Sequence, residues 1–367
     1  MRHCLKPFFL ALSLCFFGTH TAQAQATTAW EFEAGAGVNI AFRPVLRSLI
    51  HGHIGRFGIA RTVGQSSGWG QYRNDARWGL ALQTNNTGNP EELGRQWALK
   101  IQGNLALLGG LRSVIGVGLG ANTRPYNPEE NPQGVAIGTS LNLAVGVGLS
   151  LPLMVSPRGS GLLLKLQLDH QSNGSIIQPN LGSNTMTLGC VYHSAPSGSV
   201  KWWREGVSPR FAAQAMRSTS GKYSEWCARA GLGTRQRDAL GARDFVLDFG
   251  IDRRWSIDPR WGFNVGAGGL LWRLNALVPD GSLASPINAA HFGLHAGPHI
   301  DFGPLSIDFN YGRYILGPAE FSSYYKLIWR VRLNASLSAN MELWSHGFRA
   351  DHPSFGLSYH LNGRSSN

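Results

Sequence analysis

The chain has 367 residues, of which only 15% are charged, while 47 are glycine and 12 are tryptophan. This composition is typical of an exported protein built from many short β-strands, not of a helical one. The net charge of +12 would suit nucleic acid, but the basic residues are scattered along the chain, and the export signal described next excludes cytosolic partners.

Residues 1–24 have the pattern of a secretory signal peptide. Arg2 and Lys6 precede an apolar run over residues 8–17, and Ala22-Gln23-Ala24 supplies the small residues of a cleavage site. The run is too short to cross a membrane as a helix, and no later run reaches that length without glycine or charge. We therefore predict an exported chain without a transmembrane helix.

Residues 25–195 form the first predicted unit, in which apolar and small or polar residues alternate along short segments. The period of two predicts strands, each long enough to cross a bilayer. In residues 112–123, for example, Ile115, Val117 and Leu119 alternate with glycines. The eight predicted segments are 30–41, 51–63, 72–83, 95–107, 112–123, 136–151, 161–172 and 184–193.

These segments predict a closed transmembrane β-barrel, because every backbone amide in lipid needs a partner, which a closed sheet supplies. A soluble sandwich or lipocalin-like barrel is the alternative, with the apolar face turned inward. In such a soluble fold long aliphatic side chains would fill the interior and the outer face would be rich in glycine, so the transmembrane barrel is favoured.

Residues 161–172 carry two groups of chemical interest on the apolar side of their strand. One face holds Leu162, Leu164, Leu166 and Leu168, and the other holds Leu163, Lys165, Gln167 and Asp169. By the same parity, His170 and Ser172 lie on the leucine side. A base and a hydroxyl on an apolar face are explained if that face contacts lipid and the protein acts on a membrane molecule.

The run around these residues resembles the lipid A 3-O-deacylases of PagL type, related to the acyloxyacyl hydrolases. The resemblance rests on His170, Ser172 and Asn173, followed by Pro179, Asn180 and Gly182 in a turn before the last strand. Two further runs, residues 88–91 and 136–142, fit longer members of the group. Together the similarity extends over residues 50 to 195.

The resemblance implies a serine esterase that hydrolyses an ester-linked 3-hydroxyacyl chain of lipid A. It makes His170 the catalytic base and Ser172 the nucleophile. The acidic member of the family's triad falls on Asn184, which is a departure. An asparagine can hold the imidazole tautomer but cannot stabilise imidazolium by charge.

The resemblance also implies the remaining parts of the site and its partners. Asn173, with the backbone N–H groups of Gly174 and Ser175, is expected to form the oxyanion hole. No metal or organic cofactor is expected. The partners are lipopolysaccharide and the lipids of the Gram-negative outer membrane, with the oligomeric state left open. The positive charge suits lipopolysaccharide phosphates, or equally a solvated loop surface.

The rest of the chain is predicted to be a periplasmic linker (residues 196–223), a second barrel unit without the catalytic motif (224–361) and a polar tail (362–367). The second unit again has eight alternating segments. They cover residues 225–236, 244–257, 260–273, 289–302, 304–314, 324–334, 338–346 and 353–361.

Two alternatives stay open at this point. About sixteen strands can close as one large barrel or as two tandem eight-stranded barrels; the single barrel is favoured here because only one terminal aromatic strand is present. It would enclose a lumen wide enough for water. The alternative function is therefore a non-catalytic pore or structural barrel that retains the motif.

Overall fold

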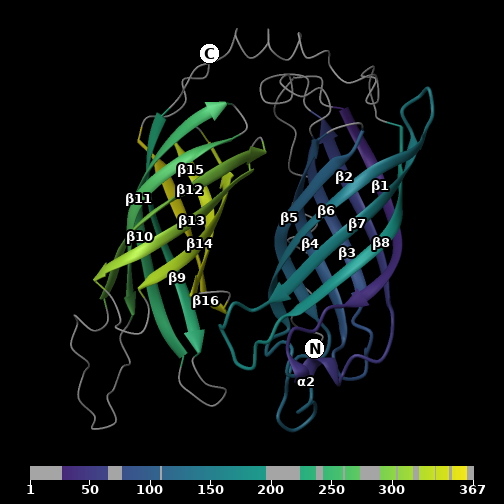
Figure 1. Ribbon diagram of the computed structural model, residues 1–367, viewed down its shortest axis with the longest axis horizontal. Helices are drawn as coiled ribbons and strands as arrows, with labels where there is room; N and C mark the ends of the chain where they lie inside the picture. Colours follow the sequence, from purple (N-terminus) through teal and green to yellow (C-terminus); the bar gives the residue numbers. More distant parts are fainter. Residues whose placement is uncertain are drawn as a thin grey trace.

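The computed structural model describes sixteen strands and one short helix (Figure 1). The described residues are 27–64, 77–107, 110–195, 224–236, 243–258, 261–272, 290–302, 305–316, 322–334, 336–346 and 349–361. The predicted signal peptide, linker and polar tail lie outside these ranges. Within them, no helix has the length and hydropathy that a membrane crossing requires.

The first eight strands form a closed antiparallel barrel. Each strand pairs with its neighbour in the sequence, and closure comes from pairing between the first and last, for example Glu31 with His193. The helix α2 lies in the connection between β1 and β2. The elements are β1 (Thr27–Asn39), α2 (Pro44–Arg47), β2 (Ile54–Gly64), β3 (Arg77–Asn86), β4 (Arg95–Ala106), β5 (Arg112–Asn122), β6 (Leu141–Val155), β7 (Gly161–Ser172) and β8 (Ser183–His193).

The other eight strands form a second closed antiparallel barrel. Here β16 returns to pair with β9, for example through Phe355 and Leu232. The strands are β9 (Ser224–Gln236), β10 (Arg243–Asp258), β11 (Trp261–Trp272), β12 (Ala290–Phe302), β13 (Leu305–Leu316), β14 (Ser323–Arg332), β15 (Leu337–His346) and β16 (Arg349–His360).

The predicted fold class, an all-β antiparallel barrel protein with two eight-stranded units, is confirmed. The preference for one large barrel was wrong. A single barrel would require the strands of one unit to pair with those of the other, whereas β8 pairs with β1 and β16 pairs with β9. Each sheet therefore closes on itself.

The faces of both barrels follow the alternation seen in the sequence. Large apolar side chains point outward and are exposed, as lipid contact requires; they include Phe32, Phe57, Leu166, Leu168 and Leu188 in the first barrel and Phe245, Leu247, Leu294, Phe355 and Leu357 in the second. Charged and polar side chains fill both interiors. Eight strands leave only enough room for such side chains.

Buried ion pairs hold the charged groups of each interior. In the first barrel Arg56 binds Glu33 at 2.7 Å and also binds Asp169. In the second, Arg229 lies 3.0 Å from Asp252 and 2.6 Å from Glu342. Since burying an unpaired charge is costly, this pairing is what allows a charged interior.

The two barrels stand side by side, with the connections β1–β2 and β7–β8 at the same end of the first barrel (Figure 1). An apolar cluster joins their outer faces: Val117 of β5 packs with Leu305 and Ile307 of β13 and Trp329 of β14. Outward-facing residues of each barrel are thus buried against the other along this line.

Candidate active site

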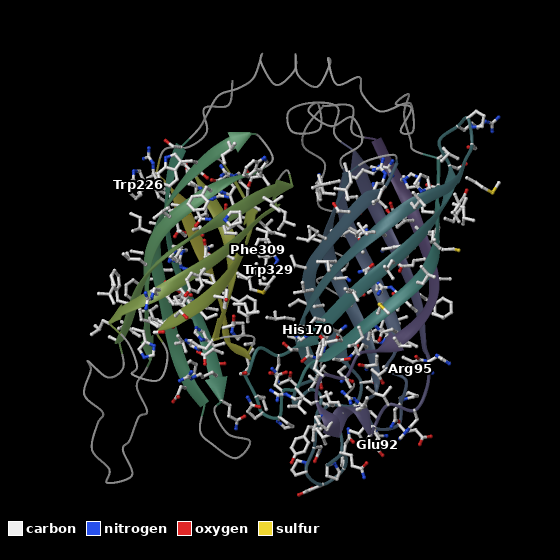
Figure 2. All side chains as sticks on the ribbon, viewed as in Figure 1. Glu92, Arg95, His170, Trp226, Phe309 and Trp329 are labelled. Atoms are coloured by element: carbon white, nitrogen blue, oxygen red, sulfur yellow. The ribbon has the colours of Figure 1, made fainter. Side chains whose placement is uncertain are left out.

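Strand β7 fixes the direction in which His170 points. Asp169, the preceding residue, faces the interior and binds Arg56 and Lys100. Leu166 and Leu168 are 42% and 44% exposed on the opposite face. Because neighbouring residues of a strand point to opposite faces, His170 is held on the outer face, where it is exposed. Figure 2 shows His170 toward the same end as the labelled Glu92 and Arg95.

Asn184 of β8 lies directly opposite His170 in the sheet. The Asn184 Oδ1 atom lies 2.7 Å from His170 Nδ1. An amide oxygen can only accept, so this contact assigns the proton to Nδ1 and leaves Nε2 as the basic nitrogen. The pair therefore has the geometry of a base and the residue that orients it.

Gly182, at the end of the β7–β8 connection, lies against the His170 ring. Its φ is +73°, and a Cβ atom built there would lie 2.7 Å from His170 Cε1. Both the backbone conformation and the lack of space require glycine at this position. Gly182 and Asn184 thus confine the imidazole from two directions.

Ser172 is the last residue of β7 and is less exposed than the sequence predicted. It shares the outer face with His170 by parity, yet it is only 6% exposed. The chain turns immediately after it, and Gly174 N–H donates to Ser172 Oγ at 3.3 Å. The hydroxyl proton of Ser172 is not used in that contact.

The side chain of Asn173 organises the turn that follows. Its Nδ2 donates to the Ile177 carbonyl at 2.7 Å, and its Oδ1 accepts from Ser175 N–H at 3.0 Å. Its own backbone N–H donates to Asn180 Oδ1 at 3.1 Å. Asn173 is fully buried, so in this conformation its amide holds the loop together.

The structure therefore brings the site residues suggested by the sequence to one end of β7 and β8. His170 and Asn184 are in contact. Ser172 lies two residues from His170, with its oxygen on Gly174 N–H. Of the three expected oxyanion donors, Asn173 Nδ2 and Ser175 N–H are engaged inside the loop. Their catalytic roles stay predictions.

Sequence reasoning missed two features. The roles of Gly182 and Asn180 in positioning were not recognised, although both belong to the turn quoted for the resemblance. The run Asp351-His352-Pro353-Ser354 also repeats the order Asp-His-x-Ser of residues 169–172. In β16, however, His352 and Ser354 are fully buried, and Ser354 donates to Asp248 inside the barrel. The repeat is no second outer-face site.

Among the described residues, no group of three or more histidine, cysteine, aspartate or glutamate side chains is arranged to hold a metal ion. The candidate site itself consists of an imidazole, a hydroxyl and amides. The chemistry that this set can perform is acyl transfer through an activated hydroxyl.

Comparison with known proteins gives one family. Residues 54–193 match the family model described as Lipid A 3-O-deacylase (PagL). The matched stretch runs from β2 through β8 and includes the candidate site, so the resemblance noted in the sequence is confirmed, together with the second barrel that extends it.

The other comparisons add little. No curated protein matches the chain. Among solved structures, a mutant of the Rh. blastica porin has 10% identity and a TM-score of 0.18, with 92% of this chain and 100% of that chain covered. The NanC porin has 8% identity and a TM-score of 0.18, with 89% and 97% covered. Such low scores carry no argument about function.

Proposed function

We propose that the first barrel, which matches the lipid A 3-O-deacylase family model over residues 54–193, is an outer-membrane serine esterase that removes an ester-linked 3-hydroxyacyl chain from lipid A. The observation that carries this proposal is the imidazole of His170, exposed on the lipid-facing wall with Nδ1 on Asn184 at 2.7 Å. A base at this place is suited to a membrane-borne substrate.

The location of the site supports an ester close to the lipid headgroups as the target. At the site's end residues 40–53, 87–94, 123–140 and 173–182 separate the strands, and at the other end residues 65–76, 107–111 and 156–160 do, so the connections are longer on average at the site's end. Outer-membrane barrels have short periplasmic turns and longer outer loops. The site's end therefore faces the outer leaflet, which contains lipopolysaccharide.

In the proposed reaction, Ser172 Oγ attacks the ester carbonyl while His170 Nε2 takes the hydroxyl proton. Asn184 holds the ring in the tautomer that makes Nε2 basic. Collapse of the tetrahedral intermediate breaks the bond to the sugar oxygen, which receives the proton from His170. Water, deprotonated by the same nitrogen, then attacks the Ser172 ester. The bond to Ser172 Oγ breaks, Oγ takes the proton back from His170, and the fatty acid is released.

Gly174 N–H is the best placed oxyanion donor. It donates to Ser172 Oγ at 3.3 Å before reaction. Once Oγ becomes an ester oxygen it is a poorer acceptor, which frees this N–H for the developing oxyanion. Asn173 and Ser175 support that donor by fixing the turn through Asn173 Nδ2 to the Ile177 carbonyl and Ser175 N–H to Asn173 Oδ1.

The alternative, a non-catalytic pore, is opposed by the filled interiors of both barrels. In the described part of the chain each lumen contains buried ion pairs, such as Lys165 with Glu33 at 2.9 Å and Arg254 with Glu225 at 2.8 Å. Eight-stranded barrels filled in this way are packed shut.

The test is mass spectrometry of lipid A from cells that express the wild type, Ser172→Ala or Ser150→Ala. Ser150 is also 6% exposed but lies in β6, at the other end of the barrel. Wild type and Ser150→Ala should each remove one hydroxyacyl mass, and Ser172→Ala should remove none. Removal that persists in Ser172→Ala would contradict the proposal, and unchanged lipid A with stepwise conductance in planar bilayers would favour the pore.

A further inference from the structure

The turn that follows Ser172 is bound to the second barrel. Gln236, the last residue of β9, donates its backbone N–H to the Ser175 carbonyl at 2.7 Å. Its side-chain Oε1 accepts from Gln178 N–H at 2.9 Å. Ser175 Oγ in turn donates to the Ala350 carbonyl, at the start of β16, at 3.0 Å. Both β9 and β16 thus contact the turn.

Two residues of this turn have a left-handed backbone conformation, which residues other than glycine rarely adopt. Gly174 and Ser175 both have positive φ, +62° and +71°. At Gly174 a Cβ atom would lie 2.7 Å from Pro353 Cδ of the second barrel. Left-handed backbone at a residue other than glycine is unfavourable and persists only where surrounding contacts impose it. For Ser175, two of those contacts come from the other barrel.

These observations link the second barrel to the candidate site. Gly174, whose N–H contacts Ser172 Oγ, lies between Ser172 and the strained residue that the second barrel holds. If Ser175 relaxed to an ordinary conformation, the peptide between Gly174 and Ser175 would rotate and the Ser175 N–H would leave Asn173 Oδ1, which it contacts at 3.0 Å. The turn would then no longer fix the direction of the neighbouring Gly174 N–H. Both catalytic geometry and oxyanion stabilisation depend on such directions.

We propose that the second barrel is a positioning element of the esterase site: Gln236 and the start of β16 hold residues 174–178 in the conformation that aims Gly174 N–H at the reacting centre. The inference rests on the proposed function. It gives the second barrel, whose described residues include no outer-face His-x-Ser pair, a role in the activity of the first. Gln236 acts through the turn and touches no reacting atom.

The experiment uses the full-length protein and compares Gln236→Ala, Gln236→Glu and Asn340→Ala. The alanine variant removes the acceptor of Gln178 N–H, whereas glutamate keeps a side-chain oxygen there. Asn340→Ala is the matched control, because it truncates an amide of the same barrel that donates to Glu342 inside the lumen. For each protein we would measure amide hydrogen exchange of residues 173–182 and the steady-state kinetics of lipid A deacylation in mixed micelles.

Gln236→Ala should speed exchange in residues 173–182 and lower kcat about tenfold with little change in KM, since one hydrogen bond is lost and substrate contacts are kept. Gln236→Glu should restore most of kcat, and Asn340→Ala should match the wild type in both measurements. Unchanged exchange in Gln236→Ala would overturn the inference. So would faster exchange with an unchanged kcat, because the contacts would then serve the fold alone.

Failure of the proposed function has a different signature. If Ser172→Ala deacylates lipid A as fast as the wild type, or if the wild type is inactive, the esterase assignment fails and the positioning role fails with it. Hydrogen exchange would then still report whether the second barrel holds the turn, because that measurement needs no substrate.

Discussion

The resemblance puts Asn184 at the position of the family's acidic residue. Its Oδ1 accepts from His170 Nδ1, so it can select the tautomer, but a neutral amide gives no charge to balance imidazolium as the proton moves. The side chain also lies on the lipid-facing wall, where a carboxylate would be expensive. Compared with a carboxylate, an amide at this position stabilises the transition state less, but it costs less free energy when it is exposed to lipid.

This division of roles predicts the behaviour of two variants. Asn184→Ala should lower kcat at least about 100-fold, because His170 loses its orientation, whereas Asn184→Asp should match or exceed the wild type because it orients the ring and adds charge. Steady-state deacylation of lipid A in micelles would measure both. Asn86→Ala is the control, since Asn86 binds Gly55 N–H at the same end of the barrel. An unaffected Asn184→Ala would remove Asn184 from the site.

Gly182 gives a second prediction at the scale of one residue. Gly182→Ala should displace the His170 ring and strongly lower kcat, because the new Cβ meets Cε1 at 2.7 Å. Gly110→Ala should cause the same backbone strain, because Gly110 has a φ of +86°, but the added Cβ would lie near Pro152 and not near the site. Both variants should lose stability, by about 1 kcal/mol or more. Thermal unfolding and kcat measured together separate the effects: equal loss of activity in the two variants would contradict the packing argument.

At the scale of the strand, inward glycines of β5 and β6 make room for long charged side chains. A Cβ at Gly146 would lie 2.4 Å from Asp169 Oδ1 and 2.7 Å from Lys100 Nζ. Glycine in a strand often marks such a close approach. The glycines that weaken the apolar pattern of these segments are therefore part of the lumen's packing.

Gly146→Leu should accordingly disrupt the first barrel. Overpacking costs about 1–3 kcal/mol, and the displaced Asp169 would also lose its contact with Lys100. We expect less of the fast-migrating folded species on unheated denaturing gels. Val147→Leu is the control, since Val147 points outward and is 46% exposed. If the variant gave as much folded protein as the control, the side chains of the lumen could rearrange around the larger residue and the packing argument would be wrong.

Strands could be predicted from the sequence because period-two alternation is local. The prediction for residues 161–172 coincides with β7, and all sixteen predicted segments overlap a strand. The prediction for β6 began five residues too early, because the strand starts at Leu141, not at residue 136. Ala136 and Ile137 are buried in a loop cluster with Leu46 and Leu93, so their apolar character reflects packing beneath α2.

The candidate site was only partly predictable. Parity put His170 on the outer face, and the motif led to Asn184. Neither could reveal that Ser172 is covered, because that depends on how residues 173–182 fold back. Gln236 contacts this turn from far along the chain, 58 positions from Gln178. No local sequence pattern predicts a contact between residues so far apart.

At the scale of the whole molecule, closure was the feature that the sequence could not decide. Apolar and polar residues alternate along a strand in the same way whether the strand belongs to one large barrel or to one of two small barrels. The difference lies in whether β8 pairs with β1 or with a strand of the second unit, which is a non-local choice. The interiors show the consequence: the buried ion pairs Arg56–Asp169 and Arg229–Glu342 each lie within one barrel, and the two barrels meet along outward apolar side chains.

Arg229 makes the independence of the second lumen testable. It is the shared partner of Asp248, Asp252 and Glu342, and removing one partner of a buried ion pair costs about 3–5 kcal/mol. Arg229→Ala should therefore lower the unfolding temperature of the second barrel, followed by circular dichroism and gel mobility. Arg313→Ala, at an exposed position, should have little effect.

The same variant connects stability to activity. Below the lowered transition, Arg229→Ala should deacylate lipid A at the wild-type rate, because no residue of the first barrel has changed. Above it, activity should fall while the first barrel stays folded, since β9 and β16 no longer hold the turn after Ser172. Activity that continues unchanged after the second barrel has unfolded would mean that the first barrel forms its site unaided.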